Sequence, residues 1–369
     1  MTKDVRVKET IDNEIIGMGR EDVKKKVQSV CKYQGRIKPS KLYSRSWEDT
    51  SEFYSYKNDM ENSFTVMQFN ILAEGLSSGP TAPTHFEPKT LGKNNYGGFT
   101  EVPHRETCID FYYRKWRILE VILHPNPPDI IGLEEIDNYY NFFKPILELF
   151  GYESVFEPKP NAPGVNFGWY SDGCALFWKS EVFRKKDHLS KAYEDQHRNY
   201  NQVYIIACLR HKRSNKDILV LVTHLKAKNG EKNESIRSKE IQILTKLLEE
   251  RRKVQNIPIL ILGDFNATPD SKCIRMLQEK LRVESAYTQL NNQDLHQNQN
   301  DIQYTTFKIR GSFATKRVID YIFYSPKILE CVRTLSIPES NTLEESKLPG
   351  FRFPSDHMNI SAIFCFPAE

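Results

Sequence analysis

Apolar segments that end abruptly at polar side chains recur along this chain. Residues 259–262 read Ile-Leu-Ile-Leu and are followed by Gly263-Asp264-Phe265-Asn266. Similar segments end at Asn70, Glu135, His224 and Asp320. Each of them predicts a buried strand that carries a polar group at its end. Because side chains alternate along a strand, Asp264 and Asn266 are expected on the same side, where both face one reacting centre.

The wider pattern predicts more strands than helices. Amphipathic helices are expected near 116–123 and over 234–252, where apolar residues recur at helical spacing and prolines follow. Strands are expected at 64–70, 129–136, 152–156, 173–178, 203–209, 218–225, 259–262, 318–324 and 359–364. Helices separate only some of these strands, so the pattern favours an α/β sandwich of two mixed sheets with helices outside. No GxGxxG motif follows a strand, which argues against a Rossmann cofactor site.

The composition and periodicity of the chain change near residue 63, and this change predicts the domain organisation. Residues 1–62 are rich in Lys, Glu, Ser and Asp without clear periodicity, which predicts a partly disordered N-terminal extension with one short helix. Residues 63–369 are expected to form the catalytic domain. Within it, residues 77–105 are dense in Gly, Pro, Thr and Asn and predict a long surface loop or insertion, while the polar segment 291–301 predicts another loop.

Composition and charge narrow the class of protein. The 369 residues include 52 basic and 48 acidic side chains, for a net charge of +4, too balanced to imply a protein that coats nucleic acid. The seven cysteines form no CxxC pair and are expected to be reduced. Neither a secretory signal nor an apolar run of about 18 residues is present, so a cytoplasmic protein without a transmembrane segment is expected, with mitochondrial import left open.

Two strand ends supply oxygen ligands for a hard cation. Glu135 follows an apolar strand, where a buried carboxylate is costly unless a cation compensates it. Asn70 ends another strand, and Mg²⁺ accepts one or two carboxylates together with neutral oxygens and water. These residues therefore predict a Mg²⁺ site. Alternatively, Asn70 is a turn former and Glu135 a surface charge.

A histidine and three acids predict proton chemistry near that site. Asp356 and His357 precede the last apolar segment, and Asp320 is expected to orient the imidazole of His357 so that it acts as a general acid or donates to a phosphoryl oxygen. Asp264 is expected to polarise an attacking water that Asn266 positions, and Asp356 to supply a second metal contact. Taken without Asp264, Glu135 and Asp320, His357 would be interpreted as an ordinary surface histidine.

Six short motifs in chain order resemble those of the endonuclease/exonuclease/phosphatase superfamily of Mg²⁺-dependent phosphohydrolases. They are Gln68-Phe69-Asn70, Leu133-Glu134-Glu135, Thr223-His224-Leu225, Gly263-Asp264-Phe265-Asn266, Asp320-Tyr321-Ile322 and Ser355-Asp356-His357. The resemblance covers about residues 63–366. It implies a four-layer α/β sandwich whose two sheets deliver these residues, His224 among the catalytic ones, to a single cleft.

Further segments resemble a branch related to the poly(A) deadenylases. They are Pro158-Lys159-Pro160, residues 171–177, residues 223–228, residues 304–310 and residues 321–325. Enzymes of this branch remove the 2′-phosphate of NADP⁺ and NADPH, so the resemblance implies NADP(H) as substrate and Mg²⁺ as cofactor. It also implies a basic cluster around the substrate phosphates, at Lys159, Lys226, Lys228 and Arg310.

The chain departs from this branch at three positions. Lys228 stands where the branch usually has Arg, which removes a bidentate phosphate contact. Phe69 replaces a Trp, and Glu134 replaces a Gln beside the metal ligand, which adds negative charge. Lys226 and Lys228 are expected to project from one side of their strand next to His224.

Alternative functions remain open at this point. Deadenylases share the same catalytic set, so a 3′-exoribonuclease that acts on poly(A) RNA is the second enzyme reading. A phosphoinositide or sphingomyelin phosphodiesterase is less compatible, because no Arg follows Ala267. A catalytically silent scaffold that binds RNA or protein is the reading from another class. The protein is expected to be a monomer.

Overall fold

Two mixed β-sheets form the centre of the molecule in this computed structural model. The structure describes residues 10–32, 41–50, 62–77, 98–99, 101–167, 169–196, 199–252, 257–291, 303–310 and 313–367. One sheet has seven strands in the order β1 (Trp47–Asp49), β14 (Glu330–Leu335), β15 (Ile360–Cys365), β2 (Ser63–Asn70), β3 (Ile130–Ile136), β5 (Gly173–Lys179) and β4 (Tyr152–Pro158). Its central pair, β2 and β3, is parallel.

The second sheet has six strands. Their order is β10 (Glu284–Ser285), β13 (Asp320–Tyr324), β9 (Ile259–Asp264), β8 (Asp217–His224), β7 (Asn199–His211) and β6 (Phe183–Glu194). Here β8 and β9 are parallel and the other neighbours are antiparallel. A separate hairpin of β11 (Thr306–Arg310) and β12 (Phe313–Arg317) completes the strands of the described chain.

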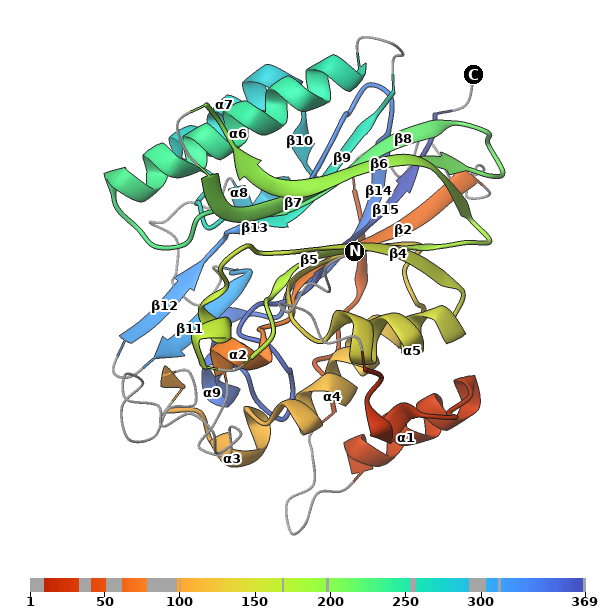
Figure 1. Cartoon of the computed structure of the whole chain (residues 1–369), viewed down its shortest axis with the longest axis vertical. Coiled ribbons are helices and arrows are strands. Elements are labelled where there is room, and N and C mark those ends of the chain that lie inside the picture. Colours follow the sequence, from red (N-terminus) through yellow and green to blue (C-terminus); the bar gives the residue numbers. More distant parts are fainter. Residues whose placement is uncertain are drawn as a thin grey trace.

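Helices cover the outer faces of both sheets, so the predicted four-layer α/β sandwich is confirmed. Helices α6 (Glu231–Arg252) and α7 (Lys272–Leu281) lie outside the six-stranded sheet, whereas α1 (Arg20–Lys32), α4 (Phe111–Leu123) and α5 (Lys144–Leu149) lie outside the other (Figure 1). Shorter helical segments are η1 (Asn13–Ile15), α2 (Glu74–Ser77), α3 (Arg105–Cys108), η5 (Tyr139–Phe143), η6 (Pro163–Phe167), α8 (Thr288–Asn291) and α9 (Ser340–Ser346). No helix in the described ranges is long and apolar enough to cross a membrane.

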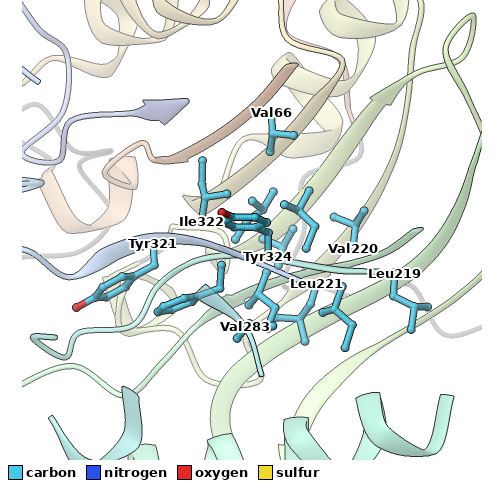
Figure 2. Close-up of a cluster of buried hydrophobic side chains, with 14 of the residues drawn as sticks. Val66, Leu219, Val220, Leu221, Val283, Tyr321, Ile322 and Tyr324 are labelled. Carbon is cyan, nitrogen blue, oxygen red and sulfur yellow. The ribbon is translucent and has the colours of Figure 1, made fainter. Parts of the chain in front are cut away.

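Apolar side chains of the two sheets pack against each other in the space between the sheets. Val66 of β2 and Ile322 of β13 point toward each other between the sheets, and Val220 of β8 lies on the same side, whereas Leu221 lies on the opposite face of β8 (Figure 2). Gly132 of β3 allows a close approach of the two sheets, because a Cβ built there would lie 3.0 Å from Leu262 of β9. The core therefore depends on a side chain being absent at this point, and it holds the strand ends of both sheets in a fixed relation.

Gly132→Ala is expected to destabilise the fold by about 1–3 kcal/mol, because the new methyl group would force Leu262 or the sheets to move in a close-packed interior. Urea denaturation of both proteins measures the difference. Gly19→Ala is the matched control, since a Cβ there meets only Asp22 Oδ2 at an ordinary 3.5 Å. Equal stability of the two variants would contradict the predicted inter-sheet contact.

Most predicted elements are found, but β6, β11, β12, β14 and α7 were not predicted. The strand β6 carries charged residues at half of its positions and shows no apolar period, because it is a half-exposed edge strand that pairs only with β7. The predicted insertion at 77–105 and loop at 291–301 fall mainly outside the described residues. The cysteines whose side chains are described, namely Cys108, Cys174, Cys208, Cys273, Cys331 and Cys365, are buried and form no disulfide with one another.

Parts of the N-terminal extension pack against the domain. Val23 and Val27 of α1 join the same apolar cluster as Trp116 of α4, and β1 extends the seven-stranded sheet by pairing with β14. Buried Lys115 also forms ion pairs with Asp12 and Glu14. The expected disorder of the extension concerns residues outside the described ranges. The boundary at residue 63 stays a prediction, although residues on both sides of it share one core.

Candidate active site

The polar strand ends of both sheets meet at one end of the sandwich. Asn70 of β2 lies beside Glu134 of β3 in parallel register, and His224 of β8 lies beside Asp264 of β9. Asp320, the first residue of β13, is opposite Asp264. Parallel strands bring their carboxyl ends to the same sheet edge, so the predicted residues converge from distant segments.

Asp264 is the centre of this convergence. Its Oδ2 accepts a hydrogen bond from Asn70 Nδ2 at 3.0 Å and lies 3.5 Å from His224 Nε2 and 3.7 Å from His357 Nε2. Burial raises the pKa of Asp264 to about 6, because the effect of burial is larger than the opposing effect of nearby His357. A fully buried carboxylate in contact with both sheets is therefore the natural partner of a cation or a polarised water.

Asp264 and Asn266 reach the same centre by a turn and not by strand alternation, so that part of the prediction is wrong. Strand β9 ends at Asp264, and Asn266 adopts a left-handed backbone with φ of 51°. Its own N–H donates to Asp264 Oδ1 at 2.9 Å, which closes the turn. Its Nδ2 lies 3.0 Å from His224 Nε2 and donates to Leu225 O at 3.1 Å.

His357 is paired with Asp320 as the sequence suggested. The imidazole Nδ1 lies 3.0 Å from both carboxylate oxygens of Asp320, and both side chains are buried. Burial alone would lower the pKa of His357, but Asp320 and Asp264 raise it to about 9. The ring is therefore an imidazolium at neutral pH, and its Nε2 has no hydrogen-bond partner among the described residues.

The segment that carries Asp356 and His357 is tied to both β2 and the β11–β12 hairpin. Ser355 Oγ donates to the carbonyl of Asn70 at 2.7 Å, and its oxygen accepts from the N–H of His357 at 3.1 Å. Thr306 Oγ1 donates to the carbonyl of Asp356 at 2.8 Å. These contacts from β2 and β11 hold the imidazolium in place, although residues 355–357 themselves belong to no named strand.

Two overlapping groups of side chains could hold a metal ion. Ligand atoms of Glu135, His224 and Asp264 lie within 4.8 Å of one another, as do those of Asp264, Asp320 and His357. Burial would raise the pKa of Glu135, but His224, Lys308 and Lys159 outweigh it and lower the pKa to about 2. Glu135 is thus a buried carboxylate, and its left-handed backbone, φ of 55°, is the kind of strain that clusters at functional sites.

The other two predicted ligands fit a metal less directly. Asn70 is beside the cluster, but its Oδ1 accepts from the N–H of Leu72 at 3.1 Å and its amide nitrogen faces Asp264. Both oxygens of Asp356 are buried without a hydrogen-bond partner among the described residues, so they retain capacity for a ligand. Carboxylate oxygens of Glu135, Asp264 and Asp356 are donors of the type that Mg²⁺ prefers, and the site fits a hard divalent cation.

Lys308 is a residue of this site that the sequence analysis missed. Its Nζ lies 3.6 Å from Asp356 Oδ2, and Arg310, two residues further along β11, lies 4.0 Å from the same oxygen. Burial would lower the pKa of Lys308, but Asp356, Glu135 and Asp264 raise it, so the ammonium stays charged. Strand alternation from the predicted Arg310 would have found it, since the two residues share one face of β11.

Lys159 and the two lysines after His224 are placed differently. Lys159 is buried at the end of β4, where it pairs with Asp172 and lies 3.4 Å from His224 Nδ1. Strand β8 ends at His224, so Lys226 and Lys228 do not project from a strand as predicted. They lie in the turn before α6, where Lys228 has φ of 77°, and neither side chain pairs with a described carboxylate.

Glu134 and Gln68 form a layer beneath the pair of Asp320 and His357. Gln68 Nε2 donates to Glu134 Oε2 at 2.7 Å and to Asp320 Oδ1 at 3.2 Å, and all three side chains are buried. Burial first, and then Asp320, raise the pKa of Glu134 well above its ordinary value. This shift favours the neutral carboxyl group, which resembles the amide that it replaces, over the extra negative charge expected at this position.

Glu134→Gln is expected to leave turnover within about threefold and to stabilise the protein at pH 8, by about 0.5–3 kcal/mol. A carboxyl with a raised folded pKa binds its proton in the folded state and releases it on unfolding, so its contribution to stability falls as pH rises above 4.5. Urea denaturation at pH 5 and pH 8 measures this, and the stability gain should shrink at pH 5. A variant that loses stability at pH 8 would show that Glu134 is ionised.

Comparison with known proteins agrees with this geometry. The model of the Endonuclease/Exonuclease/phosphatase family matches residues 68–357. Rat nocturnin is 32% identical over 334 residues, which cover 89% of this chain and 72% of the relative. The Ccr4 subunit of the Kluyveromyces lactis CCR4-Not complex, a 3′-5′-exoribonuclease, is 24% identical over 87% of this chain and 44% of its own length.

Among solved structures, the human nocturnin catalytic domain with bound sulfate superimposes with a TM-score of 0.63 and 27% identity, covering 88% of this chain and 98% of that one. The family match and the identity to rat nocturnin confirm the two resemblances found in the sequence. The chain therefore belongs to the endonuclease/exonuclease/phosphatase family of metal-dependent hydrolases of phosphate esters, and within that family it is nocturnin-like.

Proposed function

We propose that this protein is a Mg²⁺-dependent phosphatase that removes the 2′-phosphate of NADP⁺ and NADPH to give NAD⁺ or NADH and phosphate. The observation that carries this proposal is the position of two cations, Lys308 and Arg310, against Asp356 at the edge of the acidic centre. A phosphate ester that enters beside them would meet both a general acid and a water-polarising carboxylate. The nocturnin-like branch that the sequence resembles acts on NADP(H).

Different residues of the site would have different roles in hydrolysis. Glu135 and Asp264 would hold Mg²⁺, with Asn70 and Asp356 as adjoining oxygens, and the bound ion would neutralise charge on the phosphoryl oxygens. Asp264 would also polarise the attacking water, which the amide of Asn266 orients. His357, kept cationic by Asp320, would donate a hydrogen bond to the phosphoryl group as charge develops.

Several cations would bind the substrate phosphates. Lys308 and Arg310 lie directly at the centre, and Lys159 reaches it from β4 beside His224. Lys226 and Lys228 stand further out in the turn after β8, where they could contact the diphosphate of a dinucleotide. Both members of that pair are lysines, so each would supply a point charge in place of a planar fork.

A 3′-exoribonuclease acting on poly(A) is the second candidate function. The similarity to a Ccr4 exoribonuclease subunit favours it, because the same acidic centre can cleave a phosphodiester. The identity to that relative is lower than to rat nocturnin, and we therefore rank RNA second. Monomeric state and a cytoplasmic or mitochondrial location remain predictions.

A direct assay distinguishes the two substrates. Purified protein with Mg²⁺ is incubated with NADPH or with a short poly(A) RNA, and phosphate release and RNA length are followed. The expected result is phosphate release from NADPH that EDTA abolishes, because the buried carboxylates alone repel the substrate. Shortened RNA with intact NADPH would support the exoribonuclease instead. If neither reaction occurs, both proposals are contradicted.

A further inference from the structure

A cavity separate from the acidic centre opens on the outer face of the seven-stranded sheet. Its volume is about 590 Å³, and none of the residues that line it belongs to the catalytic groups described above. It lies between the end of α4, strands β2 and β15, and the segment at 41–47 that precedes and begins β1. Cavities of about 300–1,000 Å³ are the usual size for small-molecule sites.

The walls of the cavity are of two kinds. Met67, Val121 and Phe353 provide an apolar wall from β2, α4 and the segment before β15. Thr65 and Asn359 provide polar groups on the sheet, and Arg45 enters from the 41–47 segment. One cation against an apolar wall is the arrangement that recognises an amphipathic organic anion and orients it.

Arg45 is partly buried and lacks an acidic partner. Its Nε donates to Ser336 O at 2.5 Å, its Nη1 to Asn359 Oδ1 at 2.6 Å and its Nη2 to Leu335 O at 3.4 Å. All three acceptors are neutral, and no carboxylate in the described part of the chain forms an ion pair with it. The guanidinium has five N–H groups, so two of them remain available on the terminal nitrogens.

The charges around Arg45 also favour an anion. Lys41 and His124 line the same cavity, and the single acidic lining residue, Glu120, already pairs with Arg117. Burial lowers the pKa of Arg45 to about 10, which shows the cost of holding this cation without a counter-charge. A ligand carboxylate would remove that cost, because it matches the planar guanidinium in two hydrogen bonds.

We propose that this cavity is a binding site for a small carboxylate with a flat apolar body, in which Arg45 binds the carboxylate and Met67, Val121 and Phe353 cover the body. The site is distinct from the proposed phosphatase centre. Its occupation is therefore measurable as binding, whether or not the protein hydrolyses NADPH.

The test compares two probes of equal shape and different charge. Calorimetric titration with 2-naphthoate is expected to give saturable one-to-one binding, whereas neutral 2-naphthamide is expected to bind at least about tenfold more weakly, because it loses the charge-assisted pair. Equal affinities for the two probes, or no binding of 2-naphthoate up to its solubility limit, would overturn the proposal. This comparison uses the unmodified protein and does not depend on a variant folding.

Variants then locate the site. Arg45→Met is expected to weaken 2-naphthoate at least about tenfold and to leave 2-naphthamide unchanged, while Arg45→Lys should give an intermediate affinity because it keeps the charge and loses the fork. Arg310→Met is the matched control, since it removes a cation from the catalytic centre and should not change naphthoate binding. Loss of binding in Arg310→Met and not in Arg45→Met would assign the probe to the catalytic centre and reject this site.

Discussion

Glu135→Gln is expected to lower metal-dependent phosphate release from NADPH by about three orders of magnitude. The substitution keeps the size of the side chain and removes the carboxylate that lies with His224 and Asp264 within 4.8 Å. Metal affinity should fall with turnover, because an amide oxygen is a weaker ligand for Mg²⁺ than a carboxylate. Phosphate release at rising Mg²⁺ concentration, with calorimetric titration of Mg²⁺ into the same protein, measures both effects.

The control for this variant is Glu153→Gln. Glu153 is an exposed carboxylate on β4, in the same sheet, and its loss should change neither turnover nor Mg²⁺ binding. Folding of the Glu135 variant is checked by a single cooperative thermal transition, whose midpoint is expected to fall because Lys159 and Lys308 lose a buried carboxylate partner. Turnover within tenfold of the unmodified protein at the same Mg²⁺ concentration would remove Glu135 from the metal site.

The sequence predicted which polar residues converge at one end of the sandwich because strand ends are a local signal. Each apolar run stops at the residue that the sheets then bring together, so Asn70, Glu135, His224 and Asp264 could be found without knowing strand order. The order itself, with β2 beside β3 and β8 beside β9, follows from contacts between distant segments. Patterns within one segment carry no information about such pairing.

Residues that act through a turn or an edge were harder to predict. The side chain of Asn266 reaches the site because Asn266 has a left-handed backbone. Strand alternation predicted its location near Asp264 but assumed an extended backbone that the residue does not have. Lys308 lies on a hairpin outside both main sheets, and the pattern within its own segment does not show that Asp356 lies beside it. The raised pKa of Glu134 results first from its burial, which its place in the sequence does not show.

The structure of the N-terminal extension was also difficult to predict from the sequence pattern. The helix at residues 20–32 is highly charged, so its few apolar residues gave no clear period. Packing against α4 nevertheless buries Val23 and Val27, and Lys115 from α4 meets acidic residues that precede the helix. A short apolar stripe on a charged helix is enough for the helix to pack on the domain when the partner surface is complementary. That surface belongs to another part of the chain, so the helix sequence does not reveal it.

Asp320→Asn is expected to lower turnover by about 10²–10⁴ and to change its dependence on pH. Asp320 is the partner of His357 at 3.0 Å and, with Asp264, holds the pKa of this imidazole at about 9 against the effect of burial. In the unmodified protein, activity that requires the imidazolium should persist below that value and fall as pH rises through it. In the variant the same decline should occur at lower pH, because burial then acts against a weaker counter-charge.

Stability provides an independent measurement of the same pair. A histidine whose folded pKa is raised from 6.5 to about 9 contributes stability that is complete below pH 6.5 and is lost as pH rises through 9. Urea denaturation should therefore show a larger cost of Asp320→Asn at pH 6 than at pH 9.5. The control is Asp187→Asn, which removes an exposed carboxylate paired with Arg251 and should move neither the pH profile of turnover nor its magnitude. A turnover profile that keeps its alkaline limb near pH 9 in Asp320→Asn would show that another group, and not the Asp320–His357 pair, sets the protonation state required for hydrolysis.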